Sequence, residues 1–248
     1  MNIEDGQNQI RTYERVVTDY KLDVLKSGGD LQLTASGDLA LTAYGDLKLG
    51  DDRFNAMRSL VVRWCFNAPT LEGLFKLVTD APAEMRRLDD EMNNVALTFF
   101  HSPSSLERFH AIRDEVGACT FGAMACSGAI MVVLNNLLMR LKKDLKATDN
   151  AWNKCSPLID GYSLGSIIKA AANNFRHHDE WARDDPPTKK QMESIPVIAA
   201  VLKVSIGKNG KGHPFRRNVC PELVEALSGG NCEELNRKFF AFAKNMAA

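Results

Sequence analysis

A repeat of eight residues near the N-terminus constrains this chain more than any other feature. Three copies of a Gly-Asp-Leu-x-Leu pattern occupy residues 29–34, 37–42 and 45–50. The two leucines of each copy alternate, which places both on one face of a β-strand. Each Gly-Asp pair favours a turn, because glycine tolerates positive φ and aspartate can bond to its own backbone. We expect a small antiparallel β meander with one leucine face, and residues 20–25 are a candidate irregular fourth copy.

A leucine-faced meander of this size is not stable alone and must pack on another surface. The helical remainder of the chain is one candidate cover, and a partner chain is the other. Calcium-binding repeats of the RTX type are also rich in glycine and aspartate, but they carry more of both per turn than residues 29–50 do. The sequence therefore favours turn chemistry over calcium binding.

Beyond Asp52 the spacing of apolar residues changes from two to the three and four of helices. We expect breaks at residues 67–70 and 102–105. The whole pattern predicts a mainly α protein, a helical bundle with a small N-terminal antiparallel β meander, divided into a β-repeat module (1–52) and a helical domain (53–248). The expected helices cover residues 54–66, one opening at Thr70, 82–100, one from Leu106, 117–145, 163–181, one from about Thr188, 221–227 and 231–246.

Charge and cysteine content narrow the function classes. The chain has 31 basic and 31 acidic residues, so nothing draws it as a whole toward nucleic acid, and RNA binding would need a local basic patch. The six cysteines show no C-x-x-C spacing, which argues against a zinc ribbon or a thioredoxin-like motif. The polar N-terminus does not read as a signal peptide. Free cysteines without such a signal predict a reducing cytoplasm.

Residues 117–134 form a run of eighteen residues without charge, which by length alone is a marginal membrane span. The run is rich in glycine, alanine, cysteine and serine, and it is the one segment of its kind. A central helix buried on all sides explains it as well. We favour that buried helix and expect no membrane association.

Residues 173–181 hold the most unusual group of polar side chains. On a helix Asn173, Arg176 or His177, and Glu180 share a face, because they lie three and four positions apart. His178 lies nearer the apolar face. An imidazole oriented by a carboxylate can do acid–base work, and a guanidinium can hold a phosphate, so Arg176, His177 and Glu180 are the candidate catalytic residues. A polar network between helices is the structural alternative.

An asparagine, a basic residue and a histidine on a late helix of an all-α protein resemble the HEPN superfamily. Its members are small helical bundles and often metal-independent ribonucleases of bacterial defence and toxin systems. The resemblance covers residues 106–183 and implies RNA as the substrate or ligand. Arg176 followed by the polar His177 fits the signature. That signature also has a later histidine, which residues 179–183 lack, so a catalytic His177 departs from it. A non-catalytic HEPN-like bundle fits the same residues.

Residues 203–217 form a basic, glycine-rich stretch without the spacing of a phosphate-binding P-loop. Such a loop either contacts phosphate or is solvated surface. No metal and no cofactor is expected, because His177 and His178 are adjacent and point about 100° apart on a helix of 3.6 residues per turn. Ser163 sits in a literal G-x-S-x-G, but the strand–turn–helix setting is missing, so we interpret it as a helix cap. The candidate binding residues are Asn173, His178, Lys208, Lys211, Arg216 and Arg217.

Three functions remain open from the sequence. The first is a HEPN-like protein that binds or cleaves RNA in bacterial defence. The second is a non-enzymatic scaffold that docks a protein partner, or forms a homo-oligomer, through the β module. The third is a membrane-associated protein that uses residues 117–134.

Overall fold

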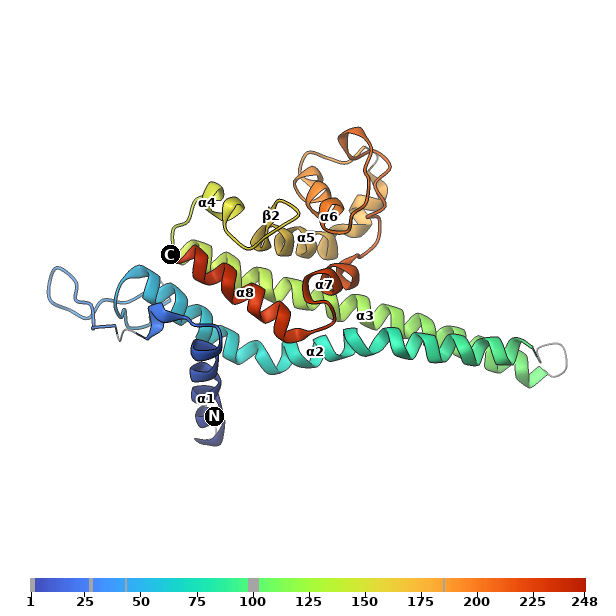
Figure 1. Ribbon diagram of the computed structural model, residues 1–248, viewed down its shortest axis with the longest axis horizontal. Coiled ribbons are helices and arrows are strands. Elements are labelled where there is room, and N and C mark those ends of the chain that lie inside the picture. The colour runs from blue at the N-terminus through green and yellow to red at the C-terminus, as the bar shows by residue number, and fades with distance from the viewer. Residues whose placement is uncertain (1–2, 27–28, 43, 98–102, 185) are drawn as a thin grey trace.

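The computed structural model describes residues 3–26, 29–42, 44–97, 103–184 and 186–248 (Figure 1). The predicted mainly helical class is confirmed. In chain order the elements are α1 (Ile3–Asp19), η1 (Asp23–Leu25), α2 (Asp52–Ala96), α3 (Pro103–Asp144), α4 (Asp149–Lys154), β1 (Leu158–Ile159), β2 (Tyr162–Ser163), α5 (Leu164–Arg183), η3 (Gln191–Glu193), α6 (Ile195–Val201), η4 (Lys208–Gly210), α7 (Cys220–Ser228) and α8 (Cys232–Met246).

A long antiparallel hairpin of α2 and α3 organises the molecule. Helices α4 to α8 cover one side of the half of this hairpin that lies near the chain termini, and its other half projects as a two-helix arm (Figure 1). This arrangement differs from the simple bundle that we expected. The arm's seam includes Leu88 and Ile112, which are fully buried.

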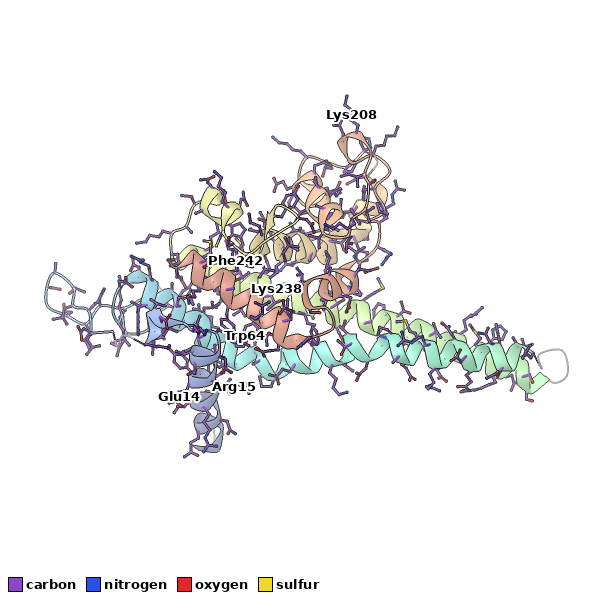
Figure 2. The ribbon with its side chains drawn as sticks, in the orientation of Figure 1. Glu14, Arg15, Trp64, Lys208, Lys238 and Phe242 are labelled. Atoms are coloured by element: carbon purple, nitrogen blue, oxygen red, sulfur yellow. The ribbon has the colours of Figure 1, made fainter. Side chains whose placement is uncertain are left out.

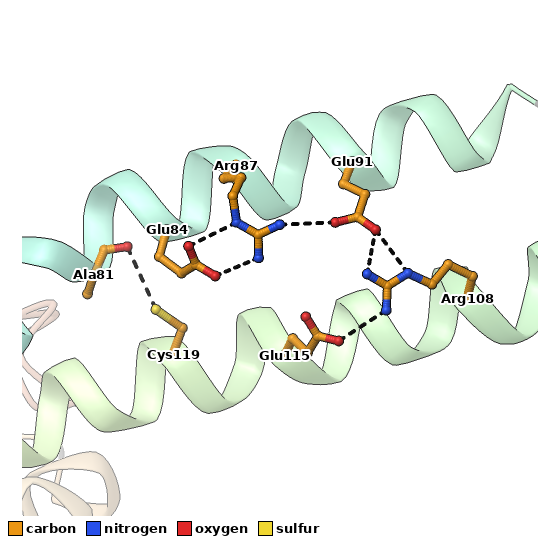
Figure 3. Close-up of polar contacts among 7 residues, drawn as sticks. All are labelled: Ala81, Glu84, Arg87, Glu91, Arg108, Glu115 and Cys119. Carbon is orange, nitrogen blue, oxygen red and sulfur yellow. Dashed lines mark hydrogen bonds and ion pairs between the residues drawn. The ribbon is translucent and has the colours of Figure 1, made fainter.

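Ion pairs reinforce the arm (Figure 3). The Arg87 guanidinium donates hydrogen bonds to Glu84 and Glu91 within α2. The Arg108 guanidinium of α3 donates hydrogen bonds across the hairpin to the same Glu91 and, within α3, to Glu115. The Arg108 hydrogen bond holds the pKa of the Glu91 carboxyl below its usual value. Exposed pairs of this kind stabilise weakly one by one, so the buried seam is the main support of the arm.

The predicted break at residues 67–70 is wrong, because α2 runs without interruption through Pro69 and Pro82. A proline inside a helix removes one backbone hydrogen bond, but both prolines are exposed. The apolar residues around them, Leu71, Phe75 and Val78, are buried in the core. Packing along α2 therefore outweighs the local preference for a break.

Helix α5 packs closely on α3, and α8 packs against both the hairpin and α5. At Gly128 of α3 a β-carbon would lie closer than 3.0 Å to the ring of Phe175 in α5, so only glycine permits this approach. On the other side, Trp64 of α2 packs against Phe239 and Phe240 of α8, with ring centroids 4.7 and 4.9 Å away. These contacts place the outward face of α5 on the side away from α3.

The small antiparallel sheet lies in the middle of the chain, and not at the N-terminus as predicted. It is the pairing of β1 with β2, in which Leu158 faces Ser163 and Ile159 faces Tyr162. Residues 31–49 contain three isolated antiparallel bridges in place of strands. The predicted fourth copy is also wrong, because residues 23–25 form the short helix η1.

The repeats close into a ring with approximate three-fold symmetry, which we call the repeat ring (residues 30–50, with 43 not described). The backbone N–H of Gln32 donates to the carbonyl of Lys48, Lys48 donates to Ala40, and Ala40 donates to Gln32, at 2.8 to 3.0 Å. A second set of three backbone hydrogen bonds, between other residues of the copies, follows the same three-fold relation. Because each copy bonds to both others, the short segments satisfy one another without forming a regular sheet.

The leucines of the repeat ring are not covered by the helical domain. Leu31, Leu33, Leu39, Leu41 and Leu47 are each between 45% and 63% exposed. The middle residues of the copies, Gln32, Ala40 and Lys48, are instead half-buried. Of the two covers considered from the sequence, the helical remainder leaves about half of each of these five side chains exposed; we call the five the leucine face.

Among the described residues, one helix, Ser104–Asp144, is long and apolar enough to cross a membrane by length and composition. Only 22% of its most apolar window is buried inside the protein. Burial on all sides, as predicted for residues 117–134, is therefore wrong for part of this helix. A single helix of this kind is weak evidence for a membrane span.

Candidate functional site

Helix α5 carries the predicted catalytic residues, and its start follows the predicted cap. The Ser163 hydroxyl accepts a hydrogen bond from the backbone N–H of Ser166 at 3.2 Å. One face of the helix, which includes Ile167 and Ala171, is fully buried. The periodicity of α5 leaves the opposite face, with Lys169, Arg176 and Glu180, exposed to solvent.

His177 and Glu180 form the one direct contact among the predicted catalytic residues. Nδ1 of His177 lies 3.1 Å from Oε1 of Glu180, and the two side chains are 40% and 54% exposed. Arg176 is exposed, and within the described residues it makes no hydrogen bond or ion pair. An imidazole thus contacts a carboxylate on an open surface, and the residue before it on the helix carries an unpaired guanidinium; solvent reaches all three groups.

Asn173 connects this face to an open groove. Its amide donates to Oγ of Ser194 at 3.2 Å, and Ser194 lines a groove of about 580 Å³. Lys169 and Glu193 line the same groove. The sequence was compatible with either an acid–base site or a polar network between helices. In the structure Asn173 stands at the groove's edge, whereas His177 and Glu180 close on each other at the surface.

His178, a predicted binding residue, is turned toward its own helix. Its Nδ1 lies 3.2 Å from the carbonyl oxygen of Phe175, and the side chain is partly buried. The neighbouring Asn174, which the sequence did not single out, is fully buried. Its amide donates to the carbonyls of Phe215 and Arg217, and its Oδ1 accepts from the N–H of Val219 at 2.9 Å. Asn174 thereby anchors the end of the basic stretch to α5.

The predicted basic residues lie on the connection between α6 and α7. Lys208, Lys211, Arg216 and Arg217 are all exposed. Figure 2 shows Lys208 at the outer end of this connection, pointing away from the body. Arg217 pairs with Glu222 of α7. The described residues contain no group of three His, Cys, Asp or Glu side chains that could hold a metal ion.

A second site, which the sequence did not predict, joins the repeat ring to the base of the hairpin. The ring of Tyr44 lies 4.5 Å from the guanidinium of Arg63 in α2 and 6.0 Å from that of Arg140 in α3. Lys48 pairs with Asp52 at 2.7 Å beside it. We call the contact of Tyr44 with the two arginines the tyrosine clamp.

Two hollows adjoin the tyrosine clamp, with volumes of about 320 and 680 Å³. Tyr44 and Lys143 line both. A signal for this contact was present in the repeat itself, because Tyr44 takes the position that Ser36 has in the preceding copy. An aromatic side chain in an otherwise polar turn points to a contact with another element.

No family model, no curated protein and no solved structure matches this chain. The HEPN resemblance therefore stays a prediction.

Proposed function

We propose that this chain is a non-enzymatic interaction protein that docks a protein partner through the leucine face of the repeat ring. The observation that carries the proposal is the exposure of five leucines, at 45% to 63% each, on one small module. Isolated bridges pair Leu33 with Leu39 and Leu41 with Leu47, so exposed leucines lie next to each other on the ring. Exposed apolar side chains that gather in this way mark a candidate interaction site.

The helical domain holds the repeat ring in place. The tyrosine clamp fixes the repeat ring at one turn. At the C-terminal end of the repeat ring, Oδ1 of Asn55 accepts a hydrogen bond from the N–H of Leu49 at 2.8 Å, and the Asn55 amide contacts the carbonyl of Leu49. A surface held in this way loses little conformational freedom on binding, and this favours affinity.

The test replaces two leucines by serine, in Leu33→Ser with Leu41→Ser. Both side chains are exposed, so the variant should fold with an unchanged circular dichroism spectrum. We expect a partner protein to co-purify with the wild type and to be absent from the double variant. Leu97→Ser is the matched control, because Leu97 is 81% exposed on the arm. If the double variant and the wild type retain the same bound proteins, the proposal is wrong.

The second candidate is a HEPN-like protein that binds or cleaves RNA in bacterial defence. The contact of His177 with Glu180, together with the exposed and unpaired Arg176 on the same helix, supports it. In such a reaction the imidazole would accept the proton of a ribose 2′-hydroxyl, and the guanidinium would bind the phosphate. The basic side chains of residues 208–217 would add phosphate contacts along a longer RNA.

The test of this candidate incubates single-stranded RNA with the wild type and with Arg176→Ala plus His177→Ala. Cleavage or binding should fall at least about tenfold in the double variant, as expected when general acid–base groups are removed. Asp179→Ala is the control, since Asp179 is exposed on the same helix and pairs with Arg183. Equal activity of the folded double variant and the wild type would contradict the RNA hypothesis.

A further inference from the structure

Helix α3 carries an apolar stripe on a side that is largely exposed within the described residues, although Val133 lines a hollow beside Tyr44 of the repeat ring. Starting at residue 118, positions three and four apart along the helix are apolar as far as residue 133. Phe121 is 73% exposed, and Ala129 and Val132 are partly exposed. The members of this outer stripe are Ala118, Phe121, Gly122, Ala125, Ala129, Val132 and Val133.

The packing of α3 agrees that this side is open. The buried residues of the same stretch, such as Ile130, Met131 and Leu134, lie on the sides that face α2 and the shorter helices. Val133, at the edge of the stripe, touches the hydrophobic core, whereas Phe121 and Val132 take no part in it.

Two further observations on α3 point the same way. A β-carbon added at Gly122 would meet no atom within 4 Å. Only 22% of the most apolar window of the helix is buried, although its mean hydropathy is 1.8. Within the described residues most of the outer stripe therefore lacks a partner.

Charges of opposite sign flank the two ends of the outer stripe. Glu107 and Asp114 precede it on the same side of α3, and Asn136, Arg140 and Lys143 follow it. All four charged side chains are exposed. Within the described residues no ion pair joins any of the four to another side chain, and the Arg140 guanidinium lies 6.0 Å from the ring of Tyr44. The outer side of α3 is therefore acidic, then apolar, then basic along its length.

We propose that a second copy of this chain packs on the outer stripe, with the two α3 helices antiparallel about a two-fold axis level with Ser127. Asp114 and Arg140 are each thirteen residues from Ser127, so each Asp114 would lie level with Arg140 of the other copy. A two-fold axis makes each contact occur twice, and the acidic end of each stripe meets the basic end of the other.

The same arrangement gives the projecting arm a surface to rest on. Residues 82–119 carry seven acidic and four basic side chains, a net charge of −3. Residues 135–146, at the base of the hairpin, carry four basic and one acidic side chain, a net charge of +3. In an antiparallel pair the arm of each copy lies along the base of the other. The stripe from Asp114 to Arg140 spans about 39 Å at 1.5 Å per residue, which is the length of a substantial helix–helix seam.

The spacing also suits a pair of helices. From Asp114 onward the outward-facing positions of α3 recur at intervals of four, three and four residues. Because these intervals add up to an eleven-residue repeat, the positions stay on one face of the helix along the whole stripe. The small side chains of Ala125 and Ala129 lie level with each other at the axis, where they let the two backbones approach closely. Farther from the axis, Gly122 of each copy lies level with Val132 of the other and leaves room for it. Phe121 of each copy lies level with Val133 of the other.

The experiment is a charge swap in the full-length chain, read by sedimentation equilibrium. The wild type should dimerise, and Asp114→Arg or Arg140→Asp alone should weaken the dimer about tenfold or more. The double variant, Asp114→Arg with Arg140→Asp, should restore the wild-type affinity to within about threefold, because the antiparallel pairing exchanges the two partners. Ala129→Arg, near the axis, should give a monomer, because it places a bulky charge where the backbones come closest.

Matched controls separate this interface from the leucine face. Arg113→Asp reverses an exposed cation on the opposite side of the same helix and should leave the dimer intact. Leu33→Ser should also leave it intact, since Leu33 lines neither of the hollows beside Lys143. A wild type that is monomeric at all concentrations overturns the inference. A dimer whose dissociation constant does not change with the charge swaps also overturns it. So does a monomer that floats with phosphatidylcholine vesicles through residues 117–134.

Discussion

The ring of Phe175 occupies the space that a β-carbon on Gly128 would need, which fixes the distance between α5 and α3. Gly128→Ala should therefore push the two helices apart or force the ring out of its place. Overpacking of this kind costs about 1–3 kcal/mol of the free energy of unfolding. Urea unfolding followed by circular dichroism measures the change.

Gly73→Ala is the control for this prediction. Gly73 lies in α2 with open space around the position of a β-carbon. Alanine there should stabilise the protein by up to about 1 kcal/mol, because glycine is the poorer helix former. If both substitutions shift the midpoint in the same direction, the packing argument at Gly128 fails.

The tyrosine clamp predicts how firmly the repeat ring is held. Tyr44→Ala removes the aromatic ring over Arg63, an interaction worth about 0.5–1 kcal/mol at an exposed site. Amide hydrogens of residues 30–50 should then exchange faster, whereas those of α5 should not change. Tyr44→Phe keeps the aromatic face and should exchange like the wild type. Equal exchange in Tyr44→Ala would show that other contacts hold the repeat ring.

Tyr20 predicts part of the protein's response to alkaline pH. Its hydroxyl donates to Glu233 at 2.9 Å, and its ring stacks on Phe240 with centroids 4.4 Å apart. Burial, followed by the hydrogen bond to Glu233, raises the pKa of the phenol. A raised pKa in the folded state means that the stabilisation is complete below the usual phenol value of about 10 and is lost as the pH rises above it.

Tyr20→Phe should therefore flatten the fall of the free energy of unfolding between about pH 10 and 12, because it removes one ionisation that opposes folding. At pH 8 the same substitution should cost about 0.5–1.5 kcal/mol through the lost hydrogen bond. Urea titrations across this range, from neutral to alkaline buffer, give both numbers. A variant whose stability falls with pH as steeply as that of the wild type would contradict the assignment.

The sequence predicted the helices well where a local signal marked their first or last residue. Ser163 caps α5 as expected, and Gly229 and Gly230, both with positive φ, separate α7 from α8. Local signals failed where contacts distant in sequence decide the structure. Pro69 predicted a break, but packing keeps α2 continuous.

The repeats illustrate the same limit. Their alternating leucines predicted extended chain, which three isolated bridges support in part. The closed ring depends on hydrogen bonds between the first and last copies, such as Gln32 to Lys48, and no local pattern encodes those. The face of α5 with Arg176, His177 and Glu180 followed from helical spacing alone. The groove beside Asn173 depends on where η3 and α6 pack, and the sequence does not show that.

Asn174 predicts a local effect at the end of the basic stretch. Asn174→Ala should leave the buried N–H of Val219 and the carbonyl of Arg217 without their partner. An unsatisfied buried group costs about 1–3 kcal/mol. We expect faster hydrogen exchange at residues 213–220, together with a lower free energy of unfolding.

Asn173→Ala is the matched control, because the Asn173 amide contacts Ser194 at 3.2 Å and is only partly buried. This variant should lose less stability and keep the exchange of residues 213–220 unchanged. If the two variants behave alike, Asn174 does not anchor this segment.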